Sequence, residues 1–265
     1  MRIMSIASGS SGNCIYVGTE STHLLIDDGI SKKRVVEGLA RLDLKPCDIN
    51  AVLISHEHID HISGLGVLLR HCSIPVHGTK GTLERINSNK KLGEMPDDIY
   101  RPHIAGDVFE IGDIRIKCTS VSHDANDPVA YTFSSGTKSA GILTDLGYYT
   151  DEIIRDFNNL DTLLVESNHD VNMLLSGPYP YMLKQRILGA KGHLSNTDCG
   201  ALLGKIIGSR TSNIFLGHLS KENNFPELAY ETVRLEINTG ENEFKADDFN
   251  IQVADRNAPS DIITI

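Results

Sequence analysis

The chain has 265 residues, of which 40% are hydrophobic and 23% charged, and its formal net charge is −10. This composition is typical of a globular protein, and no apolar run approaches the roughly 18–20 residues of a membrane span, so we expect no membrane partner. The acidic balance disfavours broad electrostatic binding to nucleic acid, although bound divalent cations would offset part of it.

The first half of the chain alternates short strands and helices. Strands are predicted at 2–6, 14–18, 23–27, 51–55 and 74–78, and helices at 31–42, 64–72 and 79–86. Ser31 is expected to cap the first helix. Residues 87–103 are expected to form an exposed loop, and 107–111 and 113–118 form a hairpin around Gly112.

The second half repeats this alternation. Strands are predicted at 129–135, 138–145, 161–167, 213–218 and 250–254, and helices at 152–157, 197–208 and 226–237. Since no linker separates the halves, we expect a single domain over residues 1–265, with mixed α/β structure. Two sheets should face each other, with helices outside.

The cysteines and the first residues indicate the compartment. The five cysteines are scattered, odd in number and without a CxxC pair, at positions 14, 47, 72, 118 and 199. The opening residues lack the long apolar segment and cleavage site of a signal peptide. We therefore expect reduced thiols and a cytoplasmic location.

The densest group of polar residues is ISHEHIDHISGLG at 54–66, which follows the apolar run AVLI. His56 and His58 are two residues apart, so they point to the same side of an extended segment. Asp60 and His61 follow where the chain turns. The zincin pattern HExxH does not fit. Each residue alone could be an ordinary surface or turn residue, but the set favours a metal site.

Four further polar residues follow predicted strands, and a metal needs such additional ligands. They are Asp27, His123, Asp145 and His218. Taken singly, each could be an ordinary strand-end residue. If the strands end at one edge of a sandwich, these side chains would meet the loop at 56–61 there.

These residues resemble the metallo-β-lactamase superfamily, through SHEHIDH (55–61), SH (122–123), TD (144–145), GH (217–218) and Asp27. The resemblance implies a four-layer αββα sandwich with two divalent metal ions, and N/O ligands suit Zn, Mn or Fe. Carried over, one metal takes His56, His58 and His123, and the other takes Asp60, His61 and His218. Asp145 would bridge the metals, and Asp27 would support the ligand loop.

Other strings resemble the nuclease branches of the superfamily, the ribonuclease Z and ribonuclease J groups, and most closely the YycJ/WalJ-type bacterial proteins. These strings are SGSSGNC (8–14), LLIDDG (24–29), ESNHD (166–170), YPYMLKQRI (179–187), GHLSN (192–196) and HLSKENN (218–224). Asp28 departs from the pattern, which usually has a small or apolar residue there. The resemblance implies a 5′-to-3′ exonuclease on DNA, with RNA still possible and the oligomeric state left open.

The mechanism that this resemblance implies is in-line attack by a metal-bridging hydroxide on phosphorus. Asp60, His193 and Glu166 are the expected catalytic residues: Asp60 or Asp145 orients the hydroxide, and His193, held by Glu166, stabilises charge or protonates the leaving oxygen. Glu166 and His193 could instead be an ordinary salt-bridging acid and a residue near a helix start.

The expected substrate-binding residues are His169, Ser195, Ser220, Lys184 and Arg186, the last two interleaved with Tyr179 and Tyr181. The loop SGSSGN could cradle a phosphate or be a plain turn. Only 47 residues separate Asp145 from His193, which leaves no room for an inserted cap domain. We therefore expect an open site and weak sequence selectivity.

Two other functions remain open. The same site would serve a small-molecule metallo-hydrolase acting on a thioester, lactone or cyclic phosphodiester, and only Glu166, His193 and residues 179–187 argue against it. A non-catalytic binding module is the second alternative, which the complete ligand set disfavours.

Overall fold

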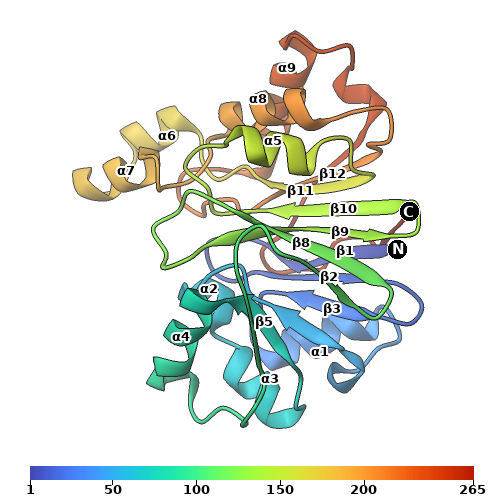
Figure 1. Cartoon of the computed structure of the whole chain (residues 1–265). Helices are drawn as coiled ribbons and strands as arrows, with labels where there is room; N and C mark the ends of the chain where they lie inside the picture. The colour runs from blue at the N-terminus through green and yellow to red at the C-terminus, as the bar shows by residue number, and fades with distance from the viewer.

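The structure, a computed structural model, describes residues 1–265 and contains two seven-stranded sheets that face each other (Figure 1). The first sheet has the order β14-β1-β2-β3-β4-β5-β6. Its strands are β1 (Arg2–Ala7), β2 (Cys14–Gly18), β3 (His23–Ile26), β4 (Ala51–Leu53), β5 (Val76–Thr79), β6 (Tyr100–His103) and β14 (Ile263–Thr264).

The second sheet has the order β13-β12-β11-β10-β9-β8-β7. Its strands are β7 (Val108–Ile111), β8 (Ile114–Ser120), β9 (Val129–Ser135), β10 (Lys138–Leu143), β11 (Thr162–Glu166), β12 (Asn213–Gly217) and β13 (Asn250–Val253).

One layer of helices covers the outer face of each sheet (Figure 1). The helices are α1 (Lys32–Ala40), α2 (Ile59–Ile62), α3 (Leu65–His71), α4 (Lys80–Ser88), α5 (Asp151–Phe157), α6 (Val171–Ser176), α7 (Tyr181–Leu188), α8 (Asn196–Ile206) and α9 (Pro226–Thr239). Short 3₁₀ turns lie at Pro46–Asp48 (η1), Lys90–Leu92 (η2) and Ala246–Asp248 (η3). No helix combines the length and apolarity that crossing a bilayer requires.

The buried side chains form three apolar layers, which explains why the four structural layers hold together. The layer between the sheets includes Leu24, Leu53, Phe133, Leu164 and Phe215. A second layer packs α1, α3 and α4 against the first sheet, and a third packs α5, α8 and α9 against the second. Alternate strand residues thus face the sister sheet and the helices. The predicted αββα sandwich is confirmed.

The local prediction of helix starts is also supported. The Ser31 hydroxyl accepts a hydrogen bond from the Arg34 N–H, which confirms the predicted cap of α1. Thr79 and Thr150 cap α4 and α5 in the same way. Between β11 and α8 the chain forms only α6 and α7, so the expected absence of an inserted cap domain is confirmed.

The prediction of a loop over 87–103 was wrong at its end, where β6 forms. This strand pairs in parallel with β5, from Tyr100 opposite Val76 to His103 opposite Thr79. It is short, lies at the sheet edge and contains Pro102, which a central strand would not tolerate. Its pairing depends on the neighbouring strand and leaves no alternating pattern in the sequence.

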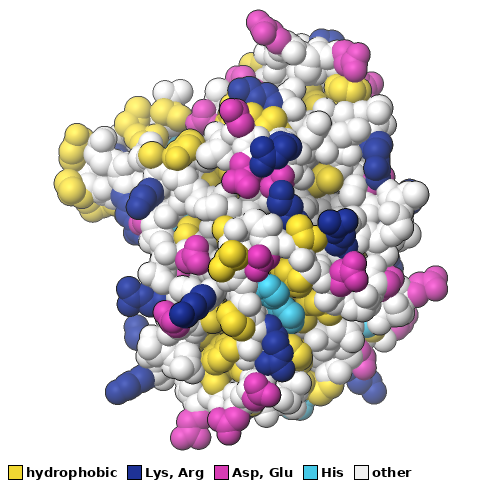
Figure 2. Space-filling view, in the orientation of Figure 1, with side chains coloured by type: hydrophobic (Ala, Val, Ile, Leu, Met, Phe, Trp, Pro, Cys, Tyr) yellow, Lys and Arg dark blue, Asp and Glu magenta, His cyan; other side chains and the backbone are white.

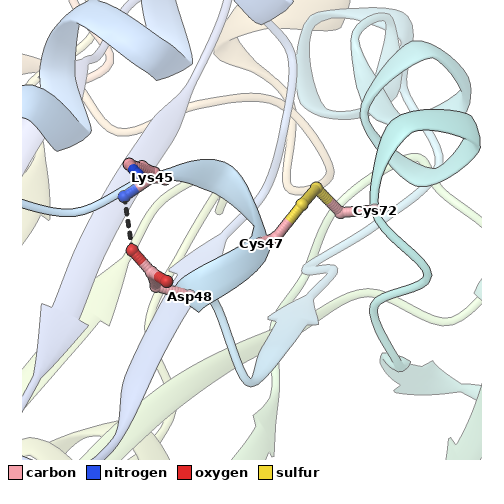
Figure 3. Close-up of a disulfide and its surroundings, with 4 residues drawn as sticks. All are labelled: Lys45, Cys47, Asp48 and Cys72. Carbon is pink, nitrogen blue, oxygen red and sulfur yellow. Dashed lines mark hydrogen bonds between the residues drawn. A yellow bond between two sulfur atoms is a disulfide. The ribbon is translucent and has the colours of Figure 1, made fainter.

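The prediction that all cysteines are free thiols was wrong, because Cys47 and Cys72 form a disulfide (Figure 3). Cys47 lies in η1 and Cys72 follows α3, with their Cα atoms 5.2 Å apart. That separation lies within the usual range for a disulfide. The 25-residue separation gives no local signal, and folding alone brings the two together. The other three cysteines are buried and free.

Because the disulfide encloses β4, α2 and the loop at 56–61, we expect its loss to destabilise the protein by about 3 kcal/mol through loop entropy. The Cys47→Ser variant is the suitable change, since Cys47 is exposed and Cys72 is buried. Its melting temperature should be lower than that of the wild type without reductant, and equal to that of the wild type with dithiothreitol. Five titratable thiols in the unreduced protein would contradict this prediction.

Candidate metal centre

The site lies where strands of both sheets end at one edge of the sandwich. Strands β3 and β4 run parallel in the first sheet, as do β10, β11 and β12 in the second. The carboxyl ends of parallel strands meet at the same edge. Asp27, Asp145 and His218 each follow such a strand, and each has a left-handed backbone, with φ of 60°, 60° and 55°. This backbone is unusual outside glycine and is often found at functional sites.

The structure brings all seven predicted ligands together. Donor atoms of His56, His58 and His123 lie within 4.8 Å of one another, and so do those of Asp60, His61 and His218. Contacts across the sandwich are equally close. His123 Nε2 lies 3.2 Å from His58 Nδ1, and His218 Nε2 lies 3.4 Å from Asp60 Oδ2.

Asp145 lies between the two groups. Its Oδ2 is 3.2 Å from His61 Nε2, and its Oδ1 is 3.8 Å from His123 Nε2. It therefore contacts one member of each group, which is the position that a bridging carboxylate needs. This carboxylate is 2% exposed, and its Oδ2 has no hydrogen-bond donor.

In three of the histidines Nδ1 is held by a carboxylate or carbonyl oxygen and Nε2 faces other ligand atoms, although His61 Nε2 also lies 3.1 Å from Asn13 Nδ2. Asp27 Oδ2 lies 2.7 Å from His61 Nδ1, and the Gly192 carbonyl 3.0 Å from His123 Nδ1. The third, His218, has its Nδ1 2.7 Å from Glu166 Oε1. Such partners fix the ring orientation and the tautomer of metal-ligating histidines.

Asp27 also binds the start of the ligand loop. Its two carboxylate oxygens accept hydrogen bonds from the Ser55 N–H and hydroxyl, both at 2.8 Å. This geometry fits the supporting role expected for Asp27. Neighbouring Asp28 is fully buried and neither of its carboxylate oxygens has a partner, so burial, with Asp27 adding to it, raises its pKa well above the usual value.

The donor set fits divalent cations. Burial alone would raise the pKa of Asp145, but the His218 and His61 rings outweigh it and hold that pKa well below its usual value. Burial disfavours a charged His218, yet Asp145 and then Asp60 and Glu166 raise its pKa to about 10. The carboxylates therefore hold positive charge at the centre. His56 Nε2 and Asp145 Oδ2 are buried without a hydrogen-bond partner, and both are atoms that a bound cation would coordinate.

Glu166 holds both a predicted metal ligand, His218, and the cavity-lining His193. Its Oε1 accepts from His193 Nδ1 at 2.8 Å and from His218 Nδ1 at 2.7 Å. Its Oε2 accepts from the Leu146 and Leu194 N–H groups, both at 3.1 Å. Burial opposes its charged form, but His193 outweighs it and the pKa falls to about 2. Glu166 is fully buried and does not line the cavity, so it is a positioning residue.

We expect Glu166→Gln to reduce metal affinity and hydrolysis by roughly 10- to 100-fold, the usual cost of losing such a partner. The carboxylate accepts hydrogen bonds on both oxygens, whereas glutamine would place an NH2 group against some of the same N–H donors. Metal titration and kcat measured on the same preparation check this. Glu243→Gln, at an exposed position, is the matched control and should behave as the wild type. Unchanged metal affinity together with unchanged kcat in Glu166→Gln would contradict the prediction.

The centre opens into a cavity of about 230 Å³. His193 lines it with a side chain 22% exposed, and Ser220 and Arg186 also line it. Arg186 forms an ion pair with Asp124, which follows His123 and was not identified from the sequence. The only feature of the sequence that could have identified Asp124 is its position next to the predicted ligand His123.

Three expected substrate-binding residues do not line the cavity. His169 is 1% exposed, with both ring nitrogens buried and unpartnered. Ser195 caps α8 by accepting from the Asp198 N–H at 3.1 Å. Lys184 Nζ donates to the Leu175 carbonyl at the end of α6, at 2.6 Å. Ser195 and Lys184 are thus engaged in local structure, and His169 is buried, which the sequence motifs did not reveal.

The loop SGSSGN also differs from a plain phosphate cradle. The Ser8 hydroxyl accepts from the His218 N–H at 2.8 Å, and the Asn13 N–H donates to the Asp60 carbonyl at 2.8 Å. The loop thus links ligands that come from opposite sheets. Ser10 lines the cavity.

Buried asparagines, which the sequence analysis did not single out, support the second sheet's side. Asn168 Nδ2 donates to the His218 carbonyl at 2.9 Å, and Asn224 Nδ2 donates to the Ser167 carbonyl at 2.9 Å. Together these contacts hold the left-handed backbone at His218.

Comparison with known proteins places this site in a family context. A family model described as "Beta-lactamase superfamily domain" matches residues 22–213. The chain is 45% identical over 230 residues to "Exodeoxyribonuclease WalJ" of Streptococcus pneumoniae serotype 2 (strain D39), covering 86% of this chain and 85% of that protein. It is 39% identical over 228 residues to "Exodeoxyribonuclease YycJ" of Bacillus anthracis, covering 86% of each.

A solved structure, Zn(2+)-bound PqqB from Methylobacterium extorquens, superimposes with a TM-score of 0.73. The match covers 98% of this chain and all of that one, at 16% identity. It shows that the two proteins share a fold.

Proposed function

This chain belongs to the β-lactamase superfamily, and from that membership and the geometry of its site we propose that it is a metal-dependent exonuclease acting on DNA. The observation that carries the proposal is the position of His193, which lines the cavity beside the seven convergent ligand residues and is held by the buried Glu166. The relatives named exodeoxyribonuclease match over most of both chains, which supports DNA as the substrate.

Two divalent cations, Zn, Mn or Fe, would supply charge for the phosphate oxygens and an activated water molecule at neutral pH. We assign His56, His58 and His123 to one cation and Asp60, His61 and His218 to the other, with Asp145 between them. The protein fixes these ligands through the contacts of Asp27, Glu166 and the Gly192 carbonyl.

The chain's own residues then act on the phosphodiester. Asp60 accepts a hydrogen bond from the attacking water and orients it. His193 is held at Nδ1 by Glu166, which leaves Nε2 to donate a proton to the departing oxygen. The cavity also presents Arg186 and Lys191 for the anionic backbone of the substrate. A DNA substrate implies the compartment that holds the chromosome, which for bacteria is the cytoplasm.

End-labelled single- and double-stranded DNA and RNA, assayed with Mn or Zn, test this function. We expect mononucleotides to be released from the 5′ end of DNA. Asp60→Ala should abolish the release, whereas Asp97→Ala, at an exposed aspartate, should not. Hydrolysis of thioesters or lactones without cleavage of any nucleic acid would support the small-molecule alternative instead.

Cleavage should depend weakly on base sequence, because the contacts proposed here are to the phosphate and the leaving oxygen and not to base edges. Equal-length strands of different sequence should be degraded at rates within a few fold. A strong preference for one sequence would contradict this prediction.

A further inference from the structure

The cavity beside the metal centre has one apolar wall, and a single segment supplies it. Tyr179, Leu183 and Ile187 line the cavity, while its other lining residues are polar or glycine. Leu183 and Ile187 are one helical turn apart on α7, so they share a face, and Tyr179 lies just before that helix. Four of the predicted metal ligands, His58, Asp60, Asp145 and His218, line the same cavity.

This wall is not part of the protein core. No residue of α7 is buried, and α6 and α7 project from the sandwich as an arm (Figure 1). Side chains that stabilise a fold are normally covered by other protein atoms. Here the apolar surface faces a cavity that also contains the reacting groups.

The arm has a second apolar surface that lies outside the cavity. Hydrophobic side chains cover its projecting end (Figure 2), where Tyr181 and Met182 are 71% and 77% exposed. Neither residue lines the cavity. Tyr179 and Tyr181 are therefore two tyrosines on one arm, of which only the first faces the metal centre.

A nucleotide has the two kinds of surface that this cavity offers: an anionic phosphate and a flat, largely apolar base. We propose that Tyr179 stacks on the base of the nucleotide whose phosphate is cleaved, with Leu183 and Ile187 against the same nucleotide. This inference rests on the proposed nuclease function. Stacking tolerates any base, because every base has a π-face.

The nucleotide that packs against this wall is an unpaired one at the end of a strand. Volumes of ligand sites run from about 300 to 1,000 Å³, and this cavity of about 230 Å³ falls just below them, so it suits a single nucleotide better than a base pair. Lys191 and Arg186, the latter paired with Asp124, also line the cavity, so cationic side chains lie beside the apolar wall. We therefore infer that the wall receives one unpaired base at a time, which at the proposed exonuclease site is the base at the strand end.

Tyr179→Ala and Tyr181→Ala test the inference as a matched pair. The first should lower kcat/KM on single-stranded DNA by roughly 5- to 100-fold, the usual effect of losing one stacked base, and the second should leave it unchanged. Tyr179→Phe should retain activity. A strand with an abasic terminal nucleotide should be cut more slowly by the wild type, with no further loss in Tyr179→Ala.

A binding measurement separates stacking from catalysis. Metal-free protein is titrated into an oligonucleotide with a terminal 2-aminopurine, and stacking on Tyr179 should quench its fluorescence. Cleavage of a strand with an abasic terminal nucleotide, which has no ring to stack, should be the same in both tyrosine variants and the wild type. If the wild type cleaved neither this substrate nor normal DNA, the proposed function itself would be wrong.

Three results would overturn the inference. One is equal cleavage of abasic and normal ends by the wild type. Another is an equal loss in Tyr181→Ala and Tyr179→Ala. The third is a change of oligomeric state in Tyr179→Ala with quenching unchanged, which would show that a second copy of the chain covers the wall.

Discussion

Asp145→Asn should lower DNA hydrolysis by about 10³-fold or more and leave the purified protein deficient in metal. The carboxylate lies between both ligand groups, 3.2 Å from His61 Nε2 and 3.8 Å from His123 Nε2. An amide there would remove a negative charge that balances the positive charge of two divalent cations. Loss of metal assistance is worth several kcal/mol, and each 1.36 kcal/mol is a factor of ten in rate.

Asparagine is the right replacement because it isolates the charge. Asp145 has a φ of 60°, a left-handed conformation that asparagine adopts more readily than most residues. The backbone should therefore be preserved, which circular dichroism and the melting temperature can verify. Asp151→Asn, at an exposed position in the first turn of α5, serves as the control. Full metal content with wild-type hydrolysis in Asp145→Asn would contradict the ligand assignment.

His193→Ala should lower DNA cleavage by roughly 10²- to 10⁴-fold, the usual contribution of a general acid. The loss on bis(p-nitrophenyl) phosphate should be much smaller, because nitrophenolate leaves without needing a proton. The reason is structural: Glu166 holds His193 Nδ1 at 2.8 Å, and the ring lines the cavity next to the ligands.

Steady-state kinetics on both substrates, with the same metal-loaded protein, measures the two losses. His71→Ala, at an exposed histidine at the end of α3, is the control and should match the wild type on both. Equal losses on the two substrates would mean that His193 does not serve the leaving group of DNA. That result would favour the small-molecule hydrolase.

The two predictions test different parts of the site. Asp145→Asn examines whether the convergent residues hold metal, whatever the substrate. His193→Ala examines what the site acts on, once metal is bound. A protein that failed only the second test would still be a metallo-hydrolase of this fold.

Much of the fold could be predicted from local sequence, because its signals are short-range. The strands at 14–18 and 129–135 were predicted with the observed bounds, since each is a continuous apolar or β-branched run. The Ser31 cap depends only on residues within one helical turn. In contrast, β6 forms through pairing with β5 and has no pattern of its own.

Local sequence is enough to predict which residues form the metal centre, because the charged and imidazole side chains stand directly after apolar strands whose parallel order brings their ends together. What surrounds these residues depends on how the whole chain folds. In the folded chain Cys47 forms a disulfide with Cys72, His169 is buried and does not line the cavity, and Tyr179 lies in the cavity wall. These outcomes depend on packing between segments far apart in the chain, and such contacts leave no local periodicity to read.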